Sequence, residues 1–164
     1  MALIKANNNT LSAVTELPTG ISGQNYPGFV AYKTGNQSLS SNTTTKITFD
    51  AEQLDNGSVY DTSNSRFTPG VPGYYFIGAF WRYDTGTNTN GNQWRLHKNG
   101  TNINLKLGII DLSDGYHYNF ITYADADDYF EMYGVSKTAC NVNGASGYQS
   151  NASQSQFYAF RIGD

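Results

Sequence analysis

The sequence predicts an all-β fold, a sandwich or barrel of about ten antiparallel strands. Three observations lead there. Aromatic residues make up 15% of the chain, with 13 Tyr and 9 Phe, and these residue types favour strands. The 17 Gly, together with many Asn, punctuate the sequence at short intervals, as turns do. No stretch shows the 3.6-residue apolar period of an amphipathic helix.

Strand-like runs follow one another from Gly28 onward. Each is short, rich in aromatic or β-branched residues, and bounded by turn residues such as the Pro69–Gly73 cluster. We expect strands at 28–33, 44–49, 58–60, 66–68, 74–83, 93–98, 102–110, 115–124, 128–135 and 156–162. The Asn99-Gly100 pair between two of these runs predicts a tight hairpin, because both residues accept the positive φ angles of a type I′ turn.

The chain divides into an N-terminal arm, residues 1–27, and a head domain, residues 28–164. The arm is polar, alternates weakly and has little to bury, so it is ordered only when something holds it. Two interpretations stay open for this arm. It is a disordered leader, or it is a docking strand that adds to a partner's sheet.

Three of the predicted strands are apolar on both faces, which a strand in a two-layer sandwich is not. In the strand at 74–83, for example, Tyr75 and Ile77 alternate with Tyr74 and Phe76. One face then belongs to the core and the other needs a partner, because exposed aromatics in such number exceed what a monomer tolerates. The residues expected on this second, intermolecular face are Tyr74, Phe76, Phe80, Tyr116, Tyr118, Tyr158 and Phe160.

Composition excludes several classes. A net charge of −3 with 14% charged residues offers no basic patch for nucleic acid. No apolar run reaches the ~20 residues of a membrane span, and the start of the chain does not read as a secretory signal. The one cysteine, Cys140, excludes an intrachain disulfide. We expect a protein made in a reducing cytoplasm that leaves the cell, if it leaves at all, inside a particle.

A spaced set of residues resembles the signature of the globular head of the first complement component's q subunit, whose fold the tumour necrosis factor cytokines share. The matching positions are Phe49, Asp55, Tyr60, Phe67, Gly73 and Tyr75, while Ile77 and Ala79 stand where that signature has aromatic residues. The resemblance implies a jelly-roll β-sandwich that assembles as a homotrimer through its inner sheet. It also implies a domain that binds rather than catalyses.

The opening residues 1–9 and 17–21 are similar to the start of virion structural proteins of tailed bacteriophages. This second resemblance implies a trimeric fibre or tail-tip head in the virion, made in the host cytoplasm, whose arm docks on other virion proteins. The alternative is a capsid decoration or cement protein. A third hypothesis, from another class, is a hydrolase of host polysaccharide, for which the scattered glutamates offer no carboxylate pair.

The polar loops at 84–92 and 141–155 are the expected binding elements, because sandwich scaffolds present loops at their ends. Their expected contacts with a host-surface glycan or protein are Asp84, Asn88, Asn90, Trp94, Asn143 and Tyr148. The alternatives are that these loops are only solvated, and that Trp94 packs inside the domain. We predict no catalytic residue and no metal site. His97 and His117 lack the further ligands of a zinc centre. Calcium at Asp125, Asp127 and Asp128 is the one cofactor to consider.

Overall fold

The computed structural model describes residues 27–83, 90–109, 116–144 and 155–164, with the backbone alone at residues 90–91, 104–109 and 116. The predicted docking arm lies outside these residues except for Pro27. The described residues form 13 strands and no helix: β1 (Gly28–Tyr32), β2 (Gln37–Leu39), β3 (Thr45–Lys46), β4 (Ala51–Asn56), β5 (Tyr60–Asp61), β6 (Arg66–Phe67), β7 (Gly73–Trp81), β8 (Asn90–Lys98), β9 (Thr101–Ile109), β10 (Tyr116–Ala124), β11 (Phe130–Val135), β12 (Cys140–Val142) and β13 (Gln156–Gly163).

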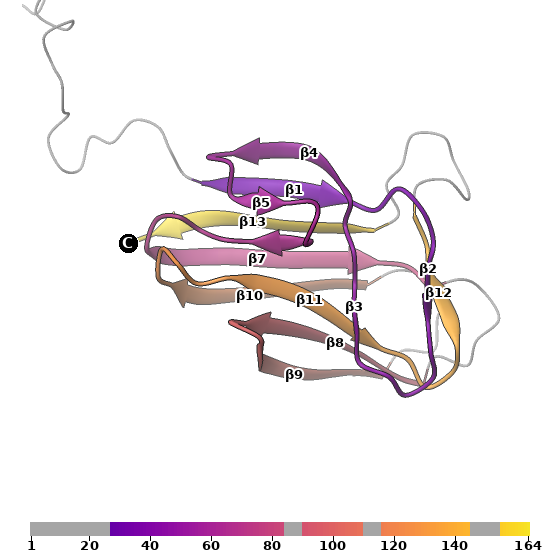
Figure 1. Ribbon diagram of the computed structural model, residues 1–164. Coiled ribbons are helices and arrows are strands. Elements are labelled where there is room, and N and C mark those ends of the chain that lie inside the picture. The colour runs from indigo at the N-terminus through magenta and orange to yellow at the C-terminus, as the bar shows by residue number, and fades with distance from the viewer. Residues whose placement is uncertain (1–26, 84–89, 110–115, 145–154) are drawn as a thin grey trace, which may run out of the picture.

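Two antiparallel sheets face each other (Figure 1). The first has five strands in the order β10-β7-β13-β1-β4. The second has the order β5-β6-β11-β8-β9, with β3 also paired to β11. A small two-stranded sheet, β12-β2, lies at one end. Because neighbours within each sheet are mostly distant in sequence, the chain crosses repeatedly between the layers, which is the arrangement of a jelly-roll sandwich.

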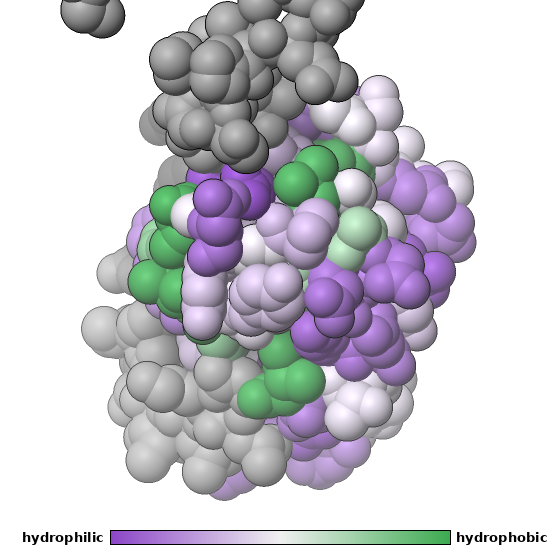
Figure 2. All heavy atoms as spheres, turned by 90° about the vertical axis from the view of Figure 1, so that its left-hand side faces the viewer, coloured by the Kyte–Doolittle hydropathy of each residue, from purple (hydrophilic) through white to green (hydrophobic). Residues whose placement is uncertain are grey.

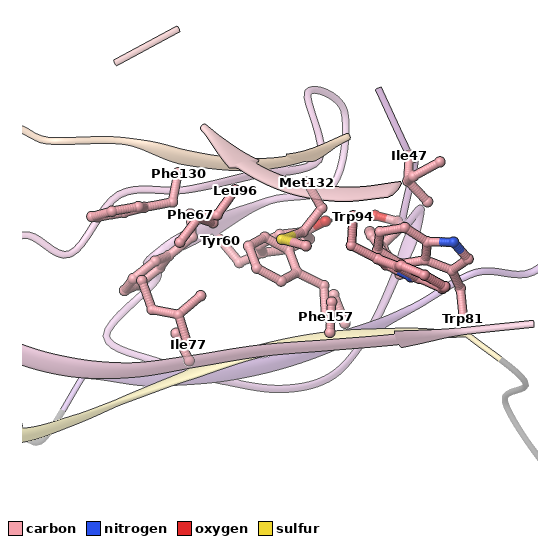
Figure 3. Close-up of a cluster of buried hydrophobic side chains, with 14 of the residues drawn as sticks. Ile47, Tyr60, Phe67, Ile77, Trp81, Trp94, Leu96, Phe130, Met132 and Phe157 are labelled. Atoms are coloured by element: carbon pink, nitrogen blue, oxygen red, sulfur yellow. Dashed lines mark hydrogen bonds between the residues drawn. The ribbon is translucent and has the colours of Figure 1, made fainter. Parts of the chain in front are cut away.

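The core fills the space between the two sheets (Figure 3). Ile77, Trp81 and Phe157 point into it from the five-stranded sheet, and Leu96 and Met132 come from the opposite sheet. These side chains are at most 1% exposed. Phe157 and Phe29 pack edge to face at 4.9 Å, a geometry that aromatic pairs favour.

The strand alternation predicted for β7 is confirmed. Tyr75, Ile77, Ala79 and Trp81 are fully buried, so this half of the strand belongs to the core. The predicted Asn99-Gly100 hairpin is also confirmed. Both residues have positive φ, 52° and 78°, and Lys98 pairs with Thr101 across the turn.

Three strands were not predicted: β2, β4 and β12. β2 and β4 are mostly polar because they lie at sheet edges, where few side chains become buried. β12 is only three residues long, although its Cys140 and Val142 are buried. Conversely, the run expected at 44–49 pairs only at Thr45 and Lys46. Its apolar members Ile47 and Phe49 are buried nevertheless, and the Ile47 amide donates to the Met132 carbonyl at 2.9 Å.

The molecule has two distinct ends. At one end the described chain begins at Pro27 and finishes at Asp164, and the Arg161 amide donates to the Pro27 carbonyl (Figure 1). At the other end lie Trp81, the start of β10 and the start of β13, which pair with one another through β7. Figure 2 looks onto the first end, where apolar residues form separate islands among polar ones. We call the second end the loop end, because the described residues that flank 84–89, 110–115 and 145–154 in the chain lie there.

Candidate interaction surfaces

Two surfaces are candidates for function: the outward face of the five-stranded sheet, and the loop end. On the first surface, the pairing register places every second residue of β10, β7 and β13 on the same side of the sheet. We call the result the outer aromatic face. Its members are Tyr74, Phe76, Gly78, Phe80, His117, Asn119, Ile121, Tyr123, Gln156, Tyr158 and Phe160.

The outer aromatic face exposes large apolar groups. Ile121 is 66% exposed, Tyr74 48%, Tyr123 44% and Phe160 37%. The rings of Tyr74 and Tyr123 pack edge to face at 5.4 Å, so the exposed groups touch one another instead of standing singly. None of the members carries a permanent charge. An exposed apolar surface of this kind is a candidate interaction site.

A glycine shapes the centre of this face. A Cβ on Gly78 would lie 2.4 Å from the Tyr158 ring and 2.4 Å from the Asn119 Oδ1. Without a Cβ there, Tyr158 lies across the strand and its hydroxyl donates to Asn119 Oδ1 at 2.7 Å. Burial raises the pKa of Tyr158. The middle of the face is therefore flattened, and the phenol is held against its neighbour.

One expected member of the intermolecular face was assigned to the wrong side. Tyr118 pairs with Ala79, and residues paired across antiparallel strands share a face, so Tyr118 lies with the core, where it packs against buried residues. Tyr116 pairs with Trp81 and has the same backbone parity, although its side chain lies outside the described residues. Of the other expected members, Tyr74, Phe76, Phe80, Tyr158 and Phe160 all lie on the outward face.

From the sequence, the alternate residues of β10 that in fact point outward were not assigned to the intermolecular face. Ile121 and Tyr123, which point outward, are among the most exposed large apolar side chains that the structure describes. The alternation of β10 was visible in the sequence. Which half faces outward was not, because that depends on the register with β7. Leu54, 47% exposed on the edge strand β4, extends the surface beyond Val30.

At the loop end, Trp94 takes the second of the two roles that the sequence allowed, since it packs inside the domain and is not a surface contact. It is 3% exposed, with its ring 5.5 Å from Trp81 and 5.9 Å from Tyr83. It occupies an inward position of β8, so it packs rather than binds. Asn143 does lie at this end, half-buried, and its carbonyl accepts from the Ser155 hydroxyl at 2.7 Å. Asp84, Asn88 and Tyr148 fall outside the described residues, as does the side chain of Asn90.

The other sheet carries a charged cluster that the sequence did not reveal. Glu131, 3% exposed, accepts from Lys46 Nζ at 2.7 Å and from Arg66 Nε at 2.9 Å, and the Tyr133 hydroxyl donates to its second oxygen at 3.1 Å. Burial alone would raise the pKa of Glu131, but these hydrogen bonds outweigh it and the pKa is lowered. His97 stacks on Tyr133 at 4.0 Å, and burial lowers its pKa.

The aspartates considered for calcium are organised as a turn. Asp128 forms an ion pair with Lys98 at 2.6 Å, and its carboxylate accepts from Asn99 Nδ2 at 2.7 Å and from the Asp125 amide at 2.6 Å. Its oxygens thus already have partners. Across the described residues, no three His, Cys, Asp or Glu side chains are grouped as a metal ion would need. The described residues also contain no helix that is long and apolar enough to cross a membrane.

No protein-family profile and no curated protein matches this sequence. Similarity appears instead in three dimensions. The globular domain of zebrafish complement 1qA aligns with a TM-score of 0.58 at 13% identity, over 83% of this chain and 97% of that one. The PRD1 vertex protein P5 aligns with a TM-score of 0.60 at 13% identity, over 85% and 99%. Murine APRIL aligns with a TM-score of 0.61 at 11% identity, over 84% and 100%.

These alignments cover almost the whole of each compared chain, so the likeness extends over a complete domain. At 11–13% identity it concerns the fold. The expectation drawn from the spaced residues between Phe49 and Tyr75 is therefore confirmed at the level of architecture. The described part of this chain has an all-β jelly-roll fold, which the globular domain of complement 1qA and APRIL share.

Proposed function

We propose that this chain forms the trimeric, non-enzymatic head of a phage virion protein, attached to the particle by its N-terminal arm and contacting the host surface through its loop end. The observation that carries the proposal is the outer aromatic face, uncharged and uncovered, on a fold that the PRD1 vertex protein P5 also has. A vertex protein is a component of a particle. The likeness therefore supports a virion role, and the exposed face supports assembly from several copies.

Copies of the same chain are the occupant that this face fits best. Its most exposed side chains, each about half accessible, present on the order of 500 Å² of apolar surface, which is near the upper limit for a monomer. Half-buried Phe76, Phe80 and Tyr158 add to that, so the area approaches the ~800 Å² per partner of a standard interface. Closed symmetry hides such a surface without forming filaments, and a trimer does so with two contacts per copy.

The start of the described chain and the loop end lie at opposite ends of the domain, which supports separate roles for the arm and the loops. The described chain starts at Pro27, at the end opposite to Tyr83 and Asn143. An arm that docks at the first end leaves the loop end pointing away from the particle. Receptor-binding surfaces on sandwich scaffolds are built from such loops.

The first experiment measures the mass in solution. We expect a trimer by sedimentation velocity at micromolar concentration. Ile121→Asp, which introduces a charge on the outer aromatic face at a 66% exposed position, should give a folded monomer. Ile103→Asp is the matched control, since Ile103 is 43% exposed on β9 of the other sheet, and it should remain a trimer. A wild-type monomer, or a trimer that Ile121→Asp leaves intact, contradicts the proposed assembly.

The second experiment locates the protein. Immunogold labelling of phage particles distinguishes a tail position from the capsid shell, where a decoration protein would lie. Purified head domain should compete with phage for adsorption to host cells. If the gold label lies on the shell and the purified head domain does not compete for adsorption, the function is capsid stabilisation and not host binding. Release of reducing sugars from host envelope would contradict a non-enzymatic role.

A further inference from the structure

The outer aromatic face contains one histidine. His117 pairs with Phe80 across β10 and β7, and its ring stacks on the Phe80 ring at 4.7 Å with an interplanar angle of 27°. It is exposed in the single copy. The imidazole thus forms part of the apolar surface, and any copy that covers Phe80 also covers His117.

Among the described residues, the neighbours of His117 on this face offer no group that would stabilise a positive charge. On β10 the next outward residue is Asn119, and across β7 lie Phe80 and Gly78. On β13, beyond Phe80, lie Gln156 and Tyr158. Among the described residues, the charged side chain that this alternation brings closest is Arg82, two residues beyond Phe80, and a cation disfavours protonation. No described carboxylate lies on this face.

We propose that the assembly of copies through the outer aromatic face is released by acid, with His117 as the group that senses it. This inference rests on the proposed function, because it requires the face to be covered. Covering an imidazole with apolar surface disfavours its charged form. A separate copy then binds the proton better than an assembled copy, and acid shifts the equilibrium toward separate copies.

The direction and the steepness of this pH dependence follow from the number of protons that separate and assembled copies bind. The assembly is strongest where the imidazoles of separate copies are neutral, and it weakens as acid protonates them. Each copy contributes one such group. For a trimer, the dissociation constant into three copies therefore rises by up to about a thousandfold for each pH unit of acidification once the separate copies are protonated. Histidine suits this role because its charge changes between pH 5 and 8.

The chain provides its own control, since it contains 2 His and the second, His97, lies on the other sheet. We would measure mass by sedimentation velocity from pH 7.5 to pH 5.0 for the wild type, His117→Gln, His117→Phe and His97→Gln. Far-ultraviolet circular dichroism would monitor the fold. His117→Phe keeps an aromatic ring on Phe80, so it serves if the glutamine variant assembles poorly.

The expected result is that the wild type and His97→Gln are trimers at pH 7.5 and folded monomers at pH 5.0, whereas His117→Phe and His117→Gln stay trimeric at both. Acid dissociation of His117→Phe, or a wild type that stays trimeric at pH 5.0, overturns this inference and leaves the proposed function standing. A His97→Gln protein that resists acid overturns it as well. A wild-type monomer at pH 7.5 contradicts the proposed function itself.

Discussion

At the scale of single residues, backbone contact at Gly144 is one of the tightest constraints that the structure describes. A Cβ at this position would lie 2.5 Å from the carbonyl carbon and oxygen of Gly35, which are main-chain atoms that cannot swing aside. The Gly144 amide also donates to Asn36 Oδ1 at 3.0 Å. This contact joins the segment after β12 to the segment before β2, which are far apart in sequence.

We therefore expect Gly144→Ala to lower the free energy of unfolding by roughly 1–3 kcal/mol through overpacking. Gly35→Ala is the control. A Cβ there meets nothing within 4 Å, so the change should cost almost nothing. Urea unfolding of both variants measures the difference. Equal stability of the two would show that this contact relaxes without cost.

Glu131 is a buried carboxylate whose charge is held by three side-chain hydrogen bonds. Glu131→Gln removes the carboxylate beneath Lys46 and Arg66, and we expect a loss of about 1–3 kcal/mol, moderated because the two cations are partly exposed. The pKa of Glu131 is lowered in the folded protein, so its contribution is present above the unfolded pKa near 4.3 and disappears as the pH falls through the folded value.

The measurement is the free energy of unfolding from pH 7 to pH 3. The difference between the wild type and Glu131→Gln should be largest at neutral pH and should shrink in acid. A difference that is constant with pH would mean that packing, and not charge, explains the effect. Sequence reasoning did not find this cluster, because its partners lie 85 and 65 residues away along the chain.

At the scale of elements, the side chains of Asn99 and Lys98 join the β8–β9 hairpin to the turn before β11. Asn99, with φ at 52°, donates to Asp128 Oδ1 at 2.7 Å and accepts from the Tyr129 amide at 2.9 Å. The Asn-Gly pair was predicted as a local turn. Its second role, bracing a neighbouring turn, is tertiary and could not be predicted from the pair alone.

Two substitutions separate these roles. Asn99→Gly keeps the positive φ and loses the two hydrogen bonds, with an expected cost of about 1–2 kcal/mol. Asn99→Ala loses both features and should cost roughly 1 kcal/mol more. Thermal unfolding of the two variants provides the comparison. An alanine variant as stable as the glycine variant would mean that the backbone conformation at this turn carries no strain.

At the scale of the whole molecule, the polarity between the chain start and the loop end gives a prediction about accessibility. Cys140 is buried, so an added cysteine can be labelled selectively. Lys137 is exposed near the start of β12, at the loop end, and Asp127 is exposed at the opposite end, in the turn before β11. If the loop end binds the host, a polyethylene-glycol maleimide on Lys137→Cys should abolish competition for adsorption.

The same label on Asp127→Cys should leave that competition intact. Both variants add the same bulk, so any difference between them reflects position. Equal inhibition by the two labels, or inhibition by the Asp127 label alone, would place the binding surface somewhere other than the loop end.

The sequence by itself determined the all-β class, most of the long strands, the hairpin at Asn99-Gly100 and the buried half of β7. These features depend on alternation and turn chemistry, which act between neighbours in the chain. The tertiary structure alone decided that Ile121 faces outward, that Trp94 is buried and that Glu131 meets two cations. Each of these depends on register or on contacts between distant strands, and a shift of one residue in register would exchange the two faces of a strand.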